Sequence, residues 1–111
     1  MILIFHFFLR YFVGKNVRAM AIFPFIIVTD KAVKQNVSII NHEKIHWNQQ
    51  IELLLLFFYI MYFCFYMFYR FKGMNHFNAY MAIPFEKEAY KNQYNLSYRK
   101  NRSLFAWLKF L

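Results

Sequence analysis

The stretch that decides the fold is HEKIHWNQQIELLLLFFYIMYFCFYMFY, residues 42–69. Its first five residues hold two histidines four positions apart, a spacing that places both rings on one face of a helix. Residues 53–69 carry no charge. That run is borderline for a membrane span, which takes about 20 apolar residues. The stretch therefore predicts a helix that begins polar and ends apolar.

The composition limits the class of protein around this stretch. The 111 residues are 60% hydrophobic and 24% aromatic, with two Gly and two Pro, which excludes a disordered chain and fits one domain over residues 1–111. The net charge of +9 suits an anionic partner. No helix-turn-helix, zinc-finger or RNA-recognition signature accompanies that charge, so we expect anionic lipid headgroups and no nucleic acid.

The chain before the histidines forms an apolar N-terminal segment, residues 2–28. Its first part, residues 2–13, suits a short helix or a strand and ends at a turn near Gly14. Residues 20–28 are rich in β-branched and aromatic side chains and predict a strand, which Pro24 confines to the edge of a sheet. An edge strand can pair with an extended peptide.

A helical region follows over residues 38–70. Residues 29–37 are polar and of mixed charge, which predicts a loop. Ser38 or Asn41 can cap the helix, because their side-chain oxygens accept the free N–H groups of its first turn. The region combines the two-histidine helix with the apolar helix.

The last helix is expected over residues 84–101. Pro84 suits the first helical position, and Glu86 and Glu88 suit the first turn electrostatically. The chain then ends in an aromatic and basic amphipathic tail, residues 104–111. Together these elements predict a mainly α chain with a small β element, an α+β fold.

The HEKIH motif is a candidate metal site. His42 and His46 can direct two imidazole nitrogens at one zinc ion, and Glu43 beside them can take a proton from a water. A third ligand must come from elsewhere in the chain. The remaining carboxylates are Asp30, Glu52, Glu86 and Glu88, and the last two lie together in FEKEAY, residues 85–90.

This combination resembles the gluzincin metallopeptidases, in which a HExxH helix gives two ligands and a later helix gives a glutamate. The resemblance implies a Zn²⁺ cofactor, a peptide or protein substrate and Glu43 as the catalytic base. Matching Ala89 to the gluzincin alanine puts Glu86 in the ligand position. Glu88 and Tyr90 are then alternative ligands or supporting residues, and Tyr90 stands where the family has an aspartate that supports a ligand histidine.

Further segments resemble a small uncharacterised family of bacterial membrane proteins with a HExxH motif. They are AIFPF (21–25), NHE (41–43), QQIELL (49–54) and PFEKEAY (84–90). This likeness implies minigluzincin-like helices packed beside an edge strand and a location at the bacterial inner membrane. It leaves the side of the membrane and the oligomeric state open.

The positions of the ligands restrict the topology. His46 precedes the apolar run and Glu86 follows it, so a simple span would place them on opposite sides of the bilayer. The 16 residues from 70 to 85 could span the return only when nearly fully extended, so a chain that breaks near residues 52–57 or lies in one leaflet is favoured. We therefore expect a monotopic or hairpin arrangement with the basic tail on anionic headgroups.

Plainer interpretations remain for each group. The two histidines can be the polar face of an interfacial helix, and the protein can be a non-enzymatic membrane or partner-binding protein with a structural or vestigial metal site. His76 and Tyr80 can stabilise an oxyanion or lie in a solvated loop. The stripe Tyr59, Tyr62, Tyr66 and Tyr69 is typical of interfacial packing.

Overall fold

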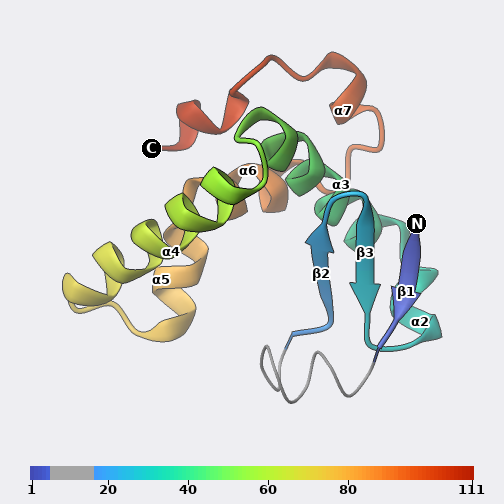
Figure 1. Cartoon of the computed structure of the whole chain (residues 1–111), viewed down its shortest axis with the longest axis horizontal. Helices are drawn as coiled ribbons and strands as arrows, with labels where there is room; N and C mark the ends of the chain where they lie inside the picture. Colours follow the sequence, from blue (N-terminus) through green and yellow to red (C-terminus); the bar gives the residue numbers. More distant parts are fainter. Residues whose placement is uncertain (6–16) are drawn as a thin grey trace.

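The structure, a computed structural model, describes residues 1–5 and 17–111. It consists mainly of helices with one three-stranded sheet, which confirms the α+β class (Figure 1). The expected turn at Gly14 and most of the segment 2–13 lie outside the described residues.

The sheet has the strand order β1-β3-β2, with β1 (Ile2–Ile4) parallel and β2 (Ala19–Ile22) antiparallel to the central β3 (Phe25–Val28). The prediction of one strand over residues 20–28 is therefore wrong. Pro24 lacks the N–H that a ladder needs, and it lies in the turn between two strands. Both β1 and β2 lie at edges of the sheet, and β2 packs against the helix of residues 37–52.

Residues 29–37, predicted as a loop, contain the short helix α2 (Lys31–Lys34). The Asp30 carboxylate caps it by accepting the Val33 N–H at 3.0 Å. The side chain of Val33 is fully buried against the sheet cluster, which fixes this turn of helix in place. The loop prediction followed the polar residues and overlooked this one apolar contact.

The helix α3 (Val37–Glu52) carries the histidines. Its cap is Asn36, whose side-chain oxygen accepts the N–H groups of Ser38 and Ile39, so neither Ser38 nor Asn41 caps it as predicted. Asn41, which was expected to cap the helix of the histidines, instead binds the backbone carbonyls at the end of the helix of residues 84–92.

The chain breaks sharply after α3, within the range expected from the sequence. Leu54 and Leu55 have φ angles of 55° and 61°, and α4 (Leu56–Phe71) leaves at 111° to α3. In the part of the chain that the structure describes, no one helix is both long and apolar enough to cross a bilayer. The two bent helices meet that test only when taken together.

The return path consists of α5 (His76–Ala82), which lies beside α4, and α6 (Pro84–Asn92) (Figure 1). The predicted helix over residues 84–101 is wrong, because it ends at Asn92 and a separate turn of helix, α7 (Tyr98–Asn101), follows. Asn41 bonds the carbonyls of residues 92, 93 and 95, and these contacts accompany the turn between α6 and α7.

Two apolar clusters hold the elements together. One lies between the sheet and α3 and contains Ile26, Val28, Val33 and Ile40. The other joins α4, α6 and the 3₁₀ helix η2 (Ala106–Phe110) through Phe58, Ile83, Phe85 and Trp107. The end of the chain, expected as an amphipathic tail, packs on α6 through the buried Trp107.

Candidate metal centre

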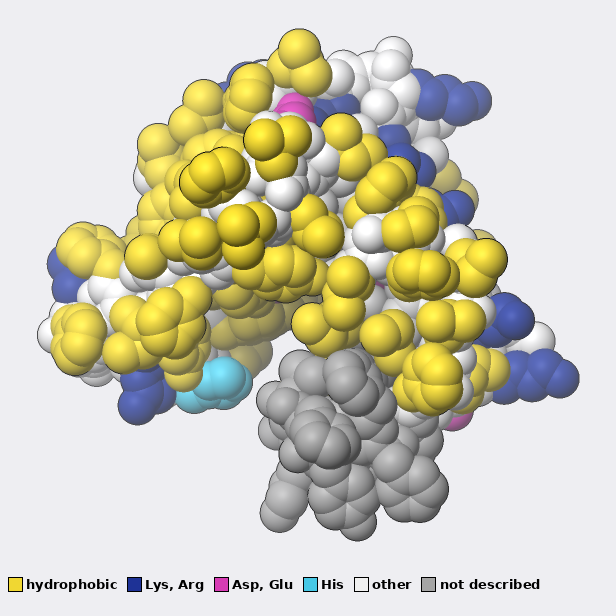
Figure 2. Space-filling model, in the orientation of Figure 1, with side chains coloured by type: hydrophobic (Ala, Val, Ile, Leu, Met, Phe, Trp, Pro, Cys, Tyr) yellow, Lys and Arg dark blue, Asp and Glu magenta, His cyan; other side chains and the backbone are white. Residues whose placement is uncertain are grey.

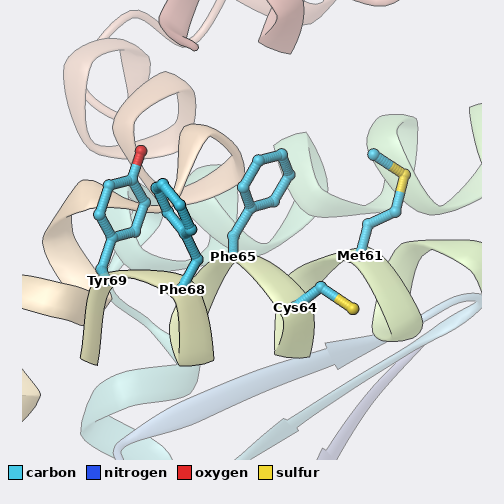
Figure 3. A pocket seen from close by; sticks show the side chains of 5 residues that line it. All are labelled: Met61, Cys64, Phe65, Phe68 and Tyr69. Carbon is cyan, nitrogen blue, oxygen red and sulfur yellow. The ribbon is translucent and has the colours of Figure 1, made fainter. Parts of the chain in front are cut away.

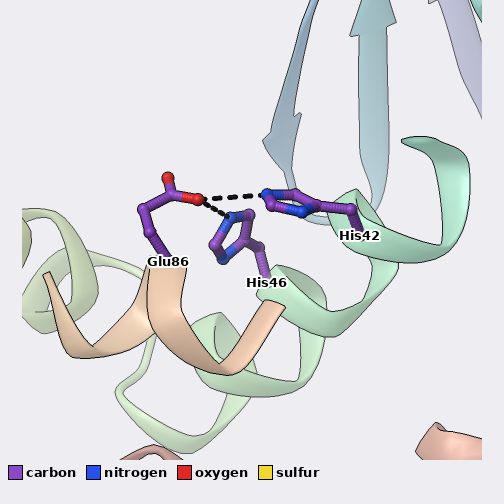
Figure 4. A group of neighbouring side chains, drawn as sticks. All are labelled: His42, His46 and Glu86. Carbon is purple, nitrogen blue, oxygen red and sulfur yellow. Dashed lines mark hydrogen bonds and ion pairs between the residues drawn. The ribbon is translucent and has the colours of Figure 1, made fainter. Parts of the chain in front are cut away.

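Helices α3 and α6 bring three candidate ligands to one point (Figure 4). The Nε2 atoms of His42 and His46 lie 3.0 and 3.1 Å from the same oxygen, Glu86 Oε1. All three side chains are buried, and one ligand atom from each lies within 4.8 Å of the others. The cluster can therefore hold a metal ion.

The spacing of these atoms fits a tetrahedral ion. Bonds of about 2.0–2.1 Å to a tetrahedral centre place neighbouring ligand atoms roughly 3.3 Å apart. The two nitrogen-to-oxygen distances are within a few tenths of an ångström of that value. Histidine nitrogens and a carboxylate oxygen are also ligands that zinc accepts.

Two glutamine side chains orient the imidazole rings. His42 Nδ1 lies 2.7 Å from Gln93 Oε1, and His46 Nδ1 lies 2.7 Å from Gln49 Oε1. An amide oxygen only accepts, so each Nδ1 donates and each Nε2 is turned toward Glu86. Gln93 was not among the residues singled out from the sequence, although it lies seven residues after Glu86, at the C-cap of α6.

The resemblance to gluzincins implies an aspartate at the position of Tyr90. The Tyr90 side chain instead packs its ring edge-on against the His42 ring at 4.4 Å between centroids. Its hydroxyl lies 2.8 Å from the Tyr80 hydroxyl. Support for His42 Nδ1 comes from Gln93, a neutral acceptor, where the resemblance implies a charged one.

The metal-free cluster is an ion pair. Burial opposes a charge on His46, but contact with Glu86 outweighs it and raises the pKa of His46 to about 9. Burial also opposes a charge on Glu86, but His46 and His42 lower its pKa well below the usual value. A metal ion must therefore displace a proton from this site.

The Glu43 carboxyl lies beside the cluster on the same helix. It is buried, and its Oε2 is 3.9 Å from His42 Nε2. Burial raises the pKa of Glu43 above its usual value, and the two histidines oppose that rise. A raised pKa makes this carboxylate a stronger proton acceptor than an exposed glutamate.

A tyrosine of the apolar helix also reaches the site. Tyr62 donates its hydroxyl to Glu86 Oε2 at 2.7 Å, which leaves Oε1 for the histidines. The stripe of tyrosines on α4 was interpreted as packing alone. Only the break between α3 and α4 brings that stripe over α6, so spacing could not assign this contact.

The other sequence candidates lie apart from the ligand cluster. Glu88 is fully buried but bonds Arg102, Tyr98 and Gln49 and not the histidines. His76 is exposed at the start of α5, where its Nδ1 lies 2.9 Å from the Tyr66 hydroxyl. The structure thus places Glu86, and neither Glu88 nor Tyr90, against both histidines.

Side-chain hydrogen bonds occupy part of the outer edge of β2. Gln50 Nε2 and the Tyr59 hydroxyl both donate to Ala21 O, at 2.8 and 2.6 Å, and the Phe23 N–H donates to Gln50 Oε1. In the antiparallel ladder, alternate residues turn their backbone groups outward, and Ala19 is the next of these. A peptide can pair with β2 only before Ala21.

A hollow of about 420 Å³ lies elsewhere (Figure 3). It runs along α4 and contains none of the cluster residues. Its lining is almost wholly apolar: Met61, Cys64, Phe65, Phe68 and Tyr69. This hollow belongs to the surface of the apolar helix and not to the candidate metal centre.

Comparison of the chain with protein-family models, with curated proteins and with solved structures finds no match. Function must therefore be argued from the cluster and its surroundings.

Proposed function

We propose that this chain is a small membrane-associated zinc metallopeptidase that hydrolyses peptide bonds. The observation that carries the proposal is the meeting of His42, His46 and Glu86 beside a buried carboxyl, Glu43. Two imidazoles from a HExxH helix and a carboxylate from a second helix form a ligand set typical of zinc hydrolases. When bound, zinc supplies a Lewis acid that lowers the pKa of a water to about 7.

The chain's own residues provide the remaining chemistry. Glu43 accepts a proton from the attacking water and passes it to the leaving amine. Tyr80 is better placed than His76 to stabilise an oxyanion, because its hydroxyl lies 2.8 Å from that of Tyr90, whose ring packs on His42, whereas His76 is exposed. An extended substrate would lie along the open end of β2, next to Ala19.

The first test is metal content by elemental analysis of detergent-purified protein. We expect about one zinc per chain, lost in His46→Ala and in Glu86→Ala. Glu43→Gln should keep the zinc, because Glu43 is not a ligand, and should lower cleavage of a fluorescence-quenched peptide mixture by about a hundredfold or more. Peptide cleavage at an unchanged rate in Glu43→Gln would contradict the peptidase proposal.

The burial of the cluster favours a second candidate, a non-enzymatic protein with a structural or vestigial metal site. Each of the three ligands is only 5% exposed, and Tyr62 covers Glu86 Oε2. Structural metal sites are closed in this way, whereas catalytic ones keep an open position. This candidate predicts bound zinc without peptide cleavage, together with unfolding when a chelator removes the metal.

The outward side of α4 supports association with a lipid bilayer. We call this side the outer stripe; its exposed apolar residues are Leu56, Phe57, Ile60, Phe63, Cys64, Phe68 and Phe71, and Arg70 is exposed beside them in the last turn of α4. A helix on a water-facing surface would carry polar side chains there. Figure 2 shows apolar side chains covering much of this face of the molecule. With a net charge of +9, the chain suits a bilayer with anionic headgroups.

Flotation with vesicles tests this association. The unmodified protein should bind phosphatidylglycerol vesicles more strongly than phosphatidylcholine vesicles. High salt should reduce this extra binding to phosphatidylglycerol and leave the binding to phosphatidylcholine unchanged. Phe63→Ser should reduce binding to both, because it removes an exposed aromatic ring from the outer stripe. Val37→Ser, an equally exposed site at the start of α3, is the matched control. Equal binding by both variants would contradict a role for the outer stripe.

A further inference from the structure

A buried charged network lies beside the ligand cluster. The Glu88 carboxylate accepts hydrogen bonds from Arg102 Nε at 2.5 Å, Arg102 NH2 at 3.1 Å, Tyr98 at 2.6 Å and Gln49 at 2.9 Å. Arg102 also makes two bonds to Glu52, at 2.8 and 3.0 Å. Arg102 thus ties the last residue of α3 to α6, and one member of the network touches Gln49.

The Gln49 amide is fixed in direction by its partners. Its Nε2 uses both hydrogens, donating to Phe85 O at 3.1 Å and to Glu88 Oε1 at 2.9 Å. Its oxygen then faces His46 Nδ1 at 2.7 Å. If the amide were turned over, its oxygen would face the Glu88 carboxylate and the Phe85 carbonyl, and neither group can donate a hydrogen bond. The buried site excludes water that could relieve that conflict.

This direction decides which nitrogen of His46 is available. Because Gln49 Oε1 can only accept, Nδ1 keeps its hydrogen, and Nε2, which faces Glu86, is the nitrogen that gives up its hydrogen to bind a metal. We infer that Glu88 is a positioning residue for the metal centre: it fixes the Gln49 amide, and the amide holds His46 in the metal-binding tautomer. The inference rests on the proposed metal site and gives Glu88 a role other than ligand.

Two matched substitutions test this role. Glu88→Gln keeps the side-chain volume and lets the Gln49 amide turn over, since a glutamine at position 88 can donate as well as accept. Glu52→Gln makes the same chemical change to the other partner of Arg102 but does not touch Gln49. Zinc affinity, measured by competition with a chromophoric chelator, should fall about 10- to 100-fold in Glu88→Gln and stay unchanged in Glu52→Gln.

A double-mutant cycle shows whether Glu88 acts through Gln49. Gln49→Met removes the acceptor for His46 and should weaken zinc binding as Glu88→Gln does. If Glu88 acts through that amide, the double variant should bind no more weakly than Gln49→Met alone. The visible absorption of the Co²⁺-loaded proteins gives a second readout, because a changed histidine orientation alters the ligand field. Effects that add in the double variant would overturn the inference.

The outcomes separate this inference from the proposed function. Equal losses in Glu88→Gln and Glu52→Gln would mean that general loosening of the network weakens the site, which overturns the positioning role alone. An unmodified protein that binds neither Zn²⁺ nor Co²⁺ would overturn the metal centre itself. If Glu88→Gln fails to fold, nitrogen-15 NMR of the zinc-loaded unmodified protein decides. A hydrogen on His46 Nδ1 is expected there, and a hydrogen on Nε2 would contradict the inference.

Discussion

Raising the pH from 7 to 9 should tighten zinc binding about 50-fold. Glu86 raises the pKa of His46 to about 9 despite burial, so below that pH the metal-free site holds a proton that zinc must displace. Well below pH 9 each pH unit costs about tenfold in apparent affinity, and because half of the His46 side chains are still protonated at pH 9, the change from pH 7 to 9 is about 50-fold. Above pH 9 the affinity should level off, because His46 has already lost its proton.

Competition titrations against a chelator, corrected for the chelator's own protonation, measure this slope. Calorimetry at pH 7 in buffers of different ionisation enthalpy should also show about one proton released from His46 per metal bound. The control is Glu86→Gln, in which the charge that raises the His46 pKa is gone. That variant should bind zinc more weakly, with a flatter pH dependence. A flat affinity from pH 7 to 9 in the unmodified protein would refute the ion-pair description.

The same ion pair makes the stability of the metal-free protein depend on pH. Because the folded-state pKa of His46 is raised, its contribution to the free energy of unfolding is complete below the unfolded-state pKa of about 6.5 and is lost as the pH rises through about 9. The midpoint of urea denaturation should therefore fall between these two pH values. An equal fall in Glu86→Gln would contradict this explanation. Trp107→Phe should not lower the melting temperature, because the buried indole Nε1–H has no hydrogen-bond partner among the described residues. A clear drop in melting temperature would show that the indole ring contributes more by packing than the unpaired group costs.

Local patterns predicted the parts of the fold that depend on near neighbours. Spacing put His42 and His46 on one helix face, and the position of the apolar run between the ligands favoured a break near residues 52–57. The strand expected over residues 20–28 is divided at Pro24, a local feature, whereas the helix expected over residues 84–101 ends where a long-range contact is made. Asn41 contacts carbonyls about 50 residues away at the end of α6, and a single-sequence pattern does not contain that contact.

The site shows the same division. The ligands could be predicted because their residue types and spacing are specific to metal binding. The groups that orient them, Gln93, Gln49 and Tyr62, are ordinary polar residues whose roles depend on which helices meet. Glutamine in particular is common on helix surfaces, so nothing in the sequence marks these two as buried acceptors.

The arm formed by α4 and α5 can vary in length without moving the ligands. Two contacts that tie α4 to the site come from its first two turns, where Tyr59 bonds Ala21 and Tyr62 bonds Glu86. Beyond them α4 and α5 run side by side and return the chain to α6 (Figure 1). Adding one matched turn to each helix would extend the arm by about 5.4 Å. The length of this arm therefore sets how far the protein extends from the helices that carry the ligands, independently of the geometry of the ligands themselves.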